Sequence, residues 1–320
     1  SAASDVYKRQ VPAHPLRQSL TEAIAQVNRL VVGKPQEIDL AFTCLLAEGH
    51  LLLDDLPGTG KTTLARALAV TLGLTFHRVQ FTSDLMPSDI VGVSVYDQKQ
   101  QQFEFHHGPI FTEVLLADEI NRASPRTQSA LLEAMAEHQV TVDRTTHRLA
   151  DPFFVIATQN PIDLVGTFPL PDAQMDRFLF RLSLGYPSQA AEFSLMRQAD
   201  RQEMLADASP CLSAAQVRGL RDMAQHLTAS DSLLHYIQRL VEATRTHSSI
   251  RSGLSTRGTL ALLKAARAHA LIQDRETVLP EDVQAVFVPV AAHRLTLELS
   301  QADVTATSLA KDIQHGTPVL

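Results

Sequence analysis

The fold can be predicted from one segment, Leu51-Leu52-Leu53-Asp54-Asp55-Leu56-Pro57-Gly58-Thr59-Gly60-Lys61-Thr62-Thr63. It begins as a short apolar run, passes through a turn of proline and glycine, and continues into a segment with leucine at positions 64, 68 and 72. The four-residue spacing of these leucines predicts a helix with one apolar face. A strand, a glycine loop and a helix in this order predict an α/β domain whose loop binds phosphate.

The residue types of the loop suit that chemistry. Glycine allows backbone N–H groups to converge on phosphate oxygens, and the following helix N-terminus adds partial positive charge. We expect Lys61 to reach the β- and γ-phosphates and the Thr62 hydroxyl to ligate Mg²⁺. A surface turn that happens to contain this motif is the alternative, which the flanking strand and helix disfavour. The residues expected to bind ATP are Pro57, Gly58, Thr59, Gly60, Lys61, Thr62 and Thr63.

A second strand-like run, 114–117, ends in the adjacent carboxylates Asp118 and Glu119. We expect Asp118 to hold Mg²⁺ through its water shell and Glu119 to polarise the attacking water. An acidic corner between strand and loop is the alternative. The position of the pair some fifty residues after a glycine loop favours the catalytic interpretation.

The remaining patterns divide the chain into two regions. Strand-like runs at 51–53, 76–81, 114–117 and 153–157 alternate with helical patterns, and two hairpins are predicted at 91–105 and 140–149. After position 188 helical periodicity dominates, with helices expected after the N-cap Ser213, from 231, over 258–272 and from 280. We predict a non-native or disordered segment at 1–14, a nucleotide-binding core at 15–198, a linker at 199–212, a helical lid at 213–312 and a tail at 313–320.

Composition excludes several classes of protein. Of the 320 residues, 45% are hydrophobic and 20% charged, as in an ordinary globular protein, and no apolar run is long enough to span a membrane. Cys44 and Cys211 are far apart, which favours a reduced, cytoplasmic chain. The net charge of −7 argues against nucleic acid as the main partner.

With these motifs in place, the chain resembles AAA+ ATPases of the MoxR family, in the branch that includes magnesium-chelatase subunits and replicative helicases. The resemblance runs from about residue 15 to 310 and includes the form of the loop with Asp55 where other loops have glycine. The motifs that carry it are 57–62, Gly108-Pro109-Ile110-Phe111, Leu115-Leu116-Ala117-Asp118-Glu119-Ile120-Asn121-Arg122-Ala123, Ala157-Thr158-Gln159-Asn160-Pro161, 170–178 with Asp176-Arg177-Phe178, and Leu254-Ser255-Thr256-Arg257.

The resemblance implies three further functional residues. Asn160 would be the polar sensor that helps place the attacking water, against the alternative of a simple Asn-Pro turn. Arg177 would be an arginine finger that enters the ATP site of a neighbouring subunit, against the alternative of an ion pair with Asp172 or Asp176. Arg257 would be a second sensor, in the lid, that contacts the γ-phosphate.

The resemblance also implies partners. It implies an ATP- and Mg²⁺-dependent ring, a hexamer, that acts on a client or co-chaperone protein with a von Willebrand A-type domain. Three alternatives are a chelatase-type motor subunit, a motor stimulated by nucleic acid, and a nucleotide-gated switch with little turnover. The histidines at 106, 107, 138 and 147 lack metal-ligand spacing, and we expect them to be solvated hairpin residues.

Overall fold

The computed structural model describes residues 14–161, 166–197, 201–298 and 305–319, so most of the predicted non-native segment lies outside the described residues. Its centre is a parallel sheet with strand order β2-β5-β8-β1-β9. The five strands are β1 (Leu51–Asp54), β2 (Phe76–Gln80), β5 (Val114–Asp118), β8 (Phe154–Gln159) and β9 (Phe180–Leu182). The first four confirm the predicted runs. β9 was not predicted, because three residues are too few to show a period.

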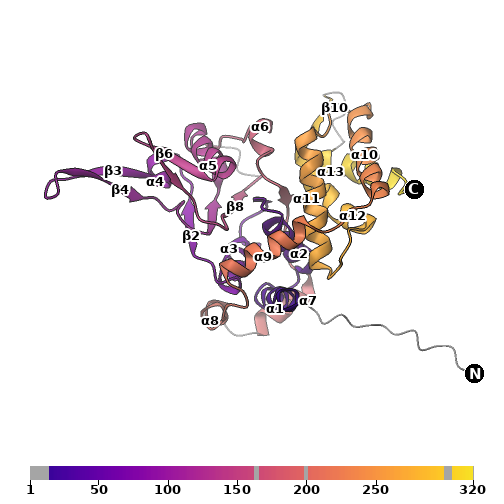
Figure 1. Cartoon of the computed structure of the whole chain (residues 1–320), viewed down its shortest axis with the longest axis horizontal. Coiled ribbons are helices and arrows are strands. Elements are labelled where there is room, and N and C mark those ends of the chain that lie inside the picture. Colours follow the sequence, from indigo (N-terminus) through magenta and orange to yellow (C-terminus); the bar gives the residue numbers. More distant parts are fainter. Residues whose placement is uncertain (1–13, 162–165, 198–200, 299–304, 320) are drawn as a thin grey trace, which may run out of the picture.

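Helices cover both faces of this sheet (Figure 1). The helices of this part of the chain, which we call the core, are α1 (Pro15–Leu30), α2 (Pro35–Leu46), α3 (Lys61–Thr71), α4 (Pro87–Val91), α5 (Pro125–Glu137) and α6 (Asp172–Met175), with the short 3₁₀ helix η1 (Ile120–Arg122). Successive strand residues point to opposite faces. Leu51 and Leu53 therefore belong to one buried cluster with α1, α2 and α3, and Leu52 belongs to another with α5.

Both predicted hairpins are present. The first consists of β3 (Gly92–Asp97) and β4 (Gln102–His107), and the second of β6 (Gln139–Val142) and β7 (Thr145–Arg148). The first hairpin projects well beyond the sheet (Figure 1).

The hairpin histidines are solvated with one exception. His106, His107 and His138 are exposed, as predicted. The prediction for His147 is wrong: its ring is half-buried and stacks on Phe105 with centroids 4.0 Å apart. The cause is a contact between the two hairpins, which local sequence does not show. Among the described residues no group of histidine, cysteine and acidic side chains has the arrangement of a metal site.

The C-terminal part is helical, as predicted. We call α9 (Ala214–Gln225), α10 (Asp231–Thr246), α11 (Thr256–Ile272), α12 (Pro280–Ala291), the 3₁₀ helix η2 (Ala292–Arg294) and α13 (Ala306–Gly316) the lid. The Ser213 hydroxyl accepts a hydrogen bond from the Gln216 N–H, which confirms the predicted N-cap. The lid also contains a small antiparallel pair that was not predicted, β10 (Ile250–Ser252) with β11 (Thr296–Leu297). The helices α7 (Gln189–Arg197) and α8 (Arg201–Ala206) connect core and lid, and α8 lies within the predicted linker.

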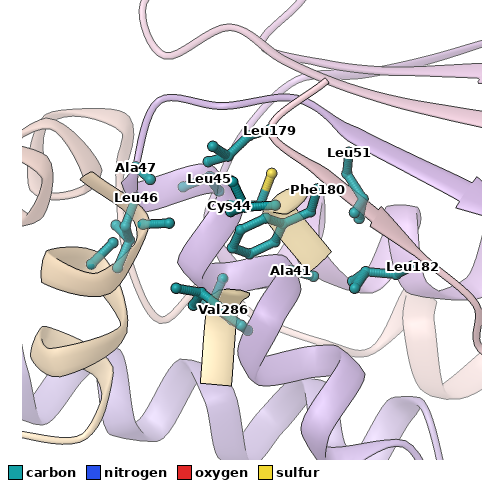
Figure 2. Packing of buried hydrophobic residues seen from close by; sticks show 14 of the residues in the cluster. Ala41, Cys44, Leu45, Leu46, Ala47, Leu51, Leu179, Phe180, Leu182 and Val286 are labelled. Atoms are coloured by element: carbon teal, nitrogen blue, oxygen red, sulfur yellow. The ribbon is translucent and has the colours of Figure 1, made fainter. Parts of the chain in front are cut away.

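Core and lid share one hydrophobic cluster. Val286 of α12 packs near Cys44 of α2 and Phe180 of β9 (Figure 2). All three side chains are fully buried, so separating the lid from the core at this point would expose apolar surface. The predicted domain boundaries themselves stay a prediction. No helix among the described residues has the length and apolarity that a membrane crossing requires.

Candidate active site

A cleft of about 410 Å³ lies at the carboxyl edge of the sheet. Because β1, β5 and β8 are parallel neighbours in register, the residues that follow them meet at this edge. The cleft is lined by Pro57, Gly58, Gly60, Lys61, Thr62, Thr63, Arg78, Gln80, Asp118, Glu119 and Asn160. It therefore brings together most of the residues that the sequence singled out, and adds two that it did not, Arg78 and Gln80.

The glycine loop has the backbone that the motif predicts. Gly58 and Gly60 have φ of +82° and +92°, in the left-handed region that favours glycine, and Gly60 is the N-cap of α3. Thr59 is buried outside the lining of the cleft, and its hydroxyl donates to the Leu56 carbonyl at 3.2 Å, which closes the turn. The first three residues of α3, Lys61, Thr62 and Thr63, line the cleft, so the N-terminus of the helix, with its unpaired N–H groups, lies at this site.

Lys61 is held against its own loop. Its Nζ donates to the carbonyl oxygens of Asp55 at 2.7 Å and Leu56 at 2.9 Å. Burial lowers the pKa of Lys61, while the charges of Asp55, Asp118 and other nearby carboxylates oppose that shift. A partly desolvated ammonium beside glycine N–H groups is suited to bind an anion such as a phosphate.

Asp55 has a structural role that the sequence did not reveal. Its carboxylate, 5% exposed, accepts hydrogen bonds from the backbone N–H of Leu184, from that of Gly185 at 3.1 Å and from the Ser183 hydroxyl at 3.1 Å. These three residues follow β9, where the chain leaves the core towards the lid. Asp55 therefore ties the phosphate-binding loop to the connection between core and lid, a tie that glycine at this position could not make.

The two carboxylates at the end of β5, Asp118 and Glu119, both form hydrogen bonds with neighbouring side chains. Asp118 Oδ1 accepts a hydrogen bond from the Thr158 hydroxyl at 2.6 Å, and Oδ2 accepts one from Arg78 Nη2 at 2.6 Å. Asp118 is buried, so these two partners fix its orientation at the cleft.

Glu119 is held by polar partners on both sides. Its Oε2 accepts a hydrogen bond from Gln80 Nε2 at 2.8 Å and forms an ion pair with Arg122 Nε at 2.9 Å. Its φ of +56° is uncommon for a residue other than glycine, and its N–H donates to the Thr158 hydroxyl at 2.9 Å. A backbone conformation of this kind is often maintained at functional sites.

Arg78 and Gln80 could have been found from the sequence. They are two residues apart on β2, so they point to the same face, and β2 pairs directly with β5. Gln80 is the register partner of Asp118. The apolar pattern from which this edge strand was predicted says nothing about the role of its polar residues.

Asn160 lies where it was expected, buried in the wall of the cleft directly after β8. Arg177 and Arg257 do not line the cleft. Arg177 is half-buried, and its Nη1 donates to the Leu132 carbonyl at 2.9 Å. Among the described residues it forms no ion pair with Asp172 or Asp176, the alternative partners. Arg257, with a side chain 66% exposed, lies 3.9 Å from Asp176 Oδ2.

Comparison with known proteins is consistent with this geometry. Residues 50–180 match the model of the ATPase family associated with various cellular activities (AAA), and residues 242–313 match the AAA lid domain.

Similar proteins cover almost the whole chain. It is 45% identical to the uncharacterised protein YeaC of Bacillus subtilis, over 97% of both chains. It is 40% identical to Chaperone MoxR1 of Mycobacterium tuberculosis, over 87% of this chain and 76% of that one, and 35% identical to Protein MoxR of Paracoccus denitrificans, over 86% and 88%. The crystal structure of a protein from Cytophaga hutchinsonii, provisionally assigned as an ATPase, superposes with a TM-score of 0.87, at 38% identity over 94% of each chain.

Proposed function

The chain belongs to the MoxR family of AAA+ ATPases, and on that basis we propose that it hydrolyses ATP at sites shared between neighbouring copies in a ring. The energy of hydrolysis drives the remodelling or maturation of a client protein. The relative named as a chaperone supports the client role.

The cleft offers ligands for both the nucleotide and Mg²⁺. The glycine loop and Lys61 would hold the phosphates. Mg²⁺ prefers oxygen ligands and keeps several waters, and Thr62 and Asp118, which carry such oxygens, both line the cleft. Bound there, the ion would neutralise charge that develops on the phosphates.

Glu119 and Asn160 fit the hydrolytic step. Gln80 and Arg122 hold the Glu119 carboxylate at the cleft, where it would polarise a water in line with the γ-phosphate. Asn160, from the neighbouring strand, would hold the same water by its amide.

One observation carries the proposal that the site is shared. Lys61, Asp118, Glu119 and Asn160 meet in one cleft, whereas Arg177, carried by the segment after α6, does not reach it. An arginine that completes a phosphoryl-transfer site raises the rate by about 10³–10⁵-fold. If another copy supplies this arginine, the rate of ATP hydrolysis would depend strongly on assembly of the ring.

Further details of the proposal rest on the family. We propose a hexameric ring in the cytoplasm, with a client or co-chaperone that contains a von Willebrand A-type domain. Arg257 would contact the γ-phosphate when the lid closes. Metal insertion into a client is one form that the maturation could take.

The test is to mix two inactive variants, Lys61→Ala and Arg177→Ala. In rings assembled at random from equal amounts, about one quarter of the interfaces pair an intact Lys61 with an intact Arg177 from the next copy. We expect the mixture to regain about that fraction of the wild-type ATPase rate, while each variant alone stays inactive.

Mixing must be demonstrated in the same sample, for example by co-purification on a tag carried by one variant. Mixed rings that show no gain in ATPase rate would exclude Arg177 as a residue acting across the interface. Full activity of Arg177→Ala alone would exclude it as a catalytic residue.

A further inference from the structure

Arg78 is a cation of the cleft to which none of the nucleotide-binding motifs assigns a role. Its side chain, from β2, lines the cleft and is 47% exposed. Of the residues that the structure describes in this lining, only Lys61 is also a cation. A ligand with several negative charges in the cleft would therefore meet two cations of the same chain.

The packing of α3 on β2 places Arg78 beside the first turn of the helix. Phe76 and Arg78 are two residues apart and point to the same face, and Phe76 lies 6.0 Å from the guanidinium of Arg66 on α3. Two strand residues advance by about 6.6 Å and four helix residues by about 6 Å. Because α3 begins at the carboxyl edge and runs back along the sheet, Arg78 lies level with Thr62, the proposed Mg²⁺ ligand.

Arg78 is joined to both carboxylates of the cleft. Its Nη2 and Nε donate to one oxygen, Asp118 Oδ2, at 2.6 and 3.1 Å. Its Nη2 also donates to Gln80 Oε1 at 3.2 Å, and Gln80 in turn donates to Glu119. Glu119 is the residue proposed to polarise the water that attacks the γ-phosphate. Arg78 thus lies at the end of the cleft where the γ-phosphate is expected.

The contact with Asp118 can be exchanged for one with a phosphate. Asp118 carries one negative charge, whereas a terminal phosphate carries about −1.5 to −2, and the planar fork of a guanidinium fits phosphate oxygens well. The Arg78 side chain is half-exposed, so it is free to turn within the cleft. Thr158 still donates to the other oxygen of Asp118, so the carboxylate stays in place after Arg78 has left.

We propose that Arg78 is a further catalytic residue of the subunit's own site, which turns from Asp118 to the γ-phosphate when ATP binds. Nucleotide binding in this cleft is part of the proposed function, on which the role of Arg78 rests. The guanidinium would stabilise charge on the phosphoryl group that is transferred. With ADP, which has no γ-phosphate, Arg78 stays on Asp118. Arg78 thereby lets the site distinguish ATP from ADP, and leaves Asp118 more open to Mg²⁺ with ATP than with ADP.

The alternative is that Arg78 merely neutralises Asp118 and affects nucleotides through the metal. The two interpretations differ when metal is absent. Calorimetric titration with ADP and with AMP-PNP, an ATP analogue that resists hydrolysis, measures both affinities in Mg²⁺ and in EDTA. We expect Arg78→Gln to weaken AMP-PNP binding about tenfold or more in both media, because one charge-assisted hydrogen bond is lost. The affinity for ADP should change by less than about threefold.

Arg66→Gln is the matched control. It removes the same charge from the same face of the sheet, near Phe76, but Arg66 does not line the cleft. It should change both affinities by less than about twofold, because exposed charges outside the site are screened. Arg66 is exposed and Arg78 half-exposed, so neither change threatens folding, and retained ADP binding shows that the cleft of Arg78→Gln is intact.

Three outcomes would overturn the role of Arg78: equal changes in the affinities for ADP and AMP-PNP, a loss of AMP-PNP affinity that requires Mg²⁺, or an equal loss in Arg66→Gln. If the unsubstituted chain binds neither nucleotide, the proposed function fails, and the role of Arg78 fails with it. If the unsubstituted chain binds both nucleotides and Arg78→Gln keeps its preference between them, the proposed function stands and only the role of Arg78 is removed.

Discussion

Replacement of Asp55 by glycine is an informative perturbation, because it makes the loop match the common phosphate-binding pattern. From the common phosphate-binding motif alone, Asp55→Gly would be expected to leave nucleotide binding unchanged or to strengthen it. The structure predicts the reverse, because the Asp55 carboxylate accepts hydrogen bonds from the N–H groups of Leu184 and Gly185 and from the Ser183 hydroxyl.

The magnitude follows from the burial of those donors. Leu184 is buried, and the loss of its acceptor costs about 1–3 kcal/mol. Gly185 is half-buried and the Ser183 side chain is exposed, so water replaces part of what they lose, and together they add about 1 kcal/mol. The extra backbone freedom of glycine in the unfolded chain adds about 0.5–1 kcal/mol. We expect Asp55→Gly to lower the free energy of unfolding by about 2.5–5 kcal/mol.

Urea unfolding monitored by circular dichroism measures this loss. Asp54→Ala is the matched control: Asp54 is the preceding residue, and its ion-pair partner Arg181 is 40% exposed, so its removal should cost less than about 1 kcal/mol. Titration with a fluorescent ATP analogue should show weaker binding to Asp55→Gly, by about tenfold, because the loop is no longer tied to the segment after β9. An Asp55→Gly variant as stable as the wild type, with equal or tighter ATP binding, would show that the Asp55 carboxylate does not tie the loop to the segment after β9.

Two other predictions concern acid stability and metal dependence. Burial lowers the pKa of His50 and His293 to about 3, so stability is fully present above the unfolded-state pKa of 6.5 and is lost as pH falls below it. Each of the two buried histidines should lower the free energy of unfolding by about 2 kcal/mol as the pH falls from 6.5 to 5. The amide of His50→Gln can replace both ring hydrogen bonds, so the free energy of unfolding of this variant, measured in urea, should depend on pH about half as steeply as that of the wild type. An unchanged slope would contradict this. Arg78 donates to Asp118, the proposed Mg²⁺ ligand, and would compete with the ion for it. Arg78→Gln should therefore lower the Mg²⁺ concentration for half-maximal ATPase activity by up to about fivefold, and an increase would be the contrary result.

The strand patterns predicted four of the five strands of the central sheet and the cleft at its carboxyl edge. The strands β1, β5 and β8 are buried and show a continuous apolar run, and parallel strands bring the residues after them to one edge. Lys61, Asp118, Glu119 and Asn160 could therefore be placed together from the order of strands and loops in the sequence.

Contacts between distant segments could not be predicted in this way. Asp55 and Leu184 are 129 residues apart, and Arg294 and Asp176 are 118 apart. In each pair a charged side chain meets a backbone N–H group or a carboxylate from a distant segment. The hydrophobic periodicity of a single segment gives no sign of such a contact. The short strand β9 and the helix α8 were missed because three and six residues show too little periodicity.

A structure of the Glu119→Gln variant with Mg²⁺ and ATP would show whether the site is shared between copies, because this change should retain the nucleotide without hydrolysis. We expect a ring in which the Arg177 guanidinium of one copy lies about 2.7–2.9 Å from a γ-phosphate oxygen bound by Lys61 of the next copy. A γ-phosphate contacted by groups of a single chain, with Arg177 of every copy still on its own Leu132 carbonyl, would contradict it.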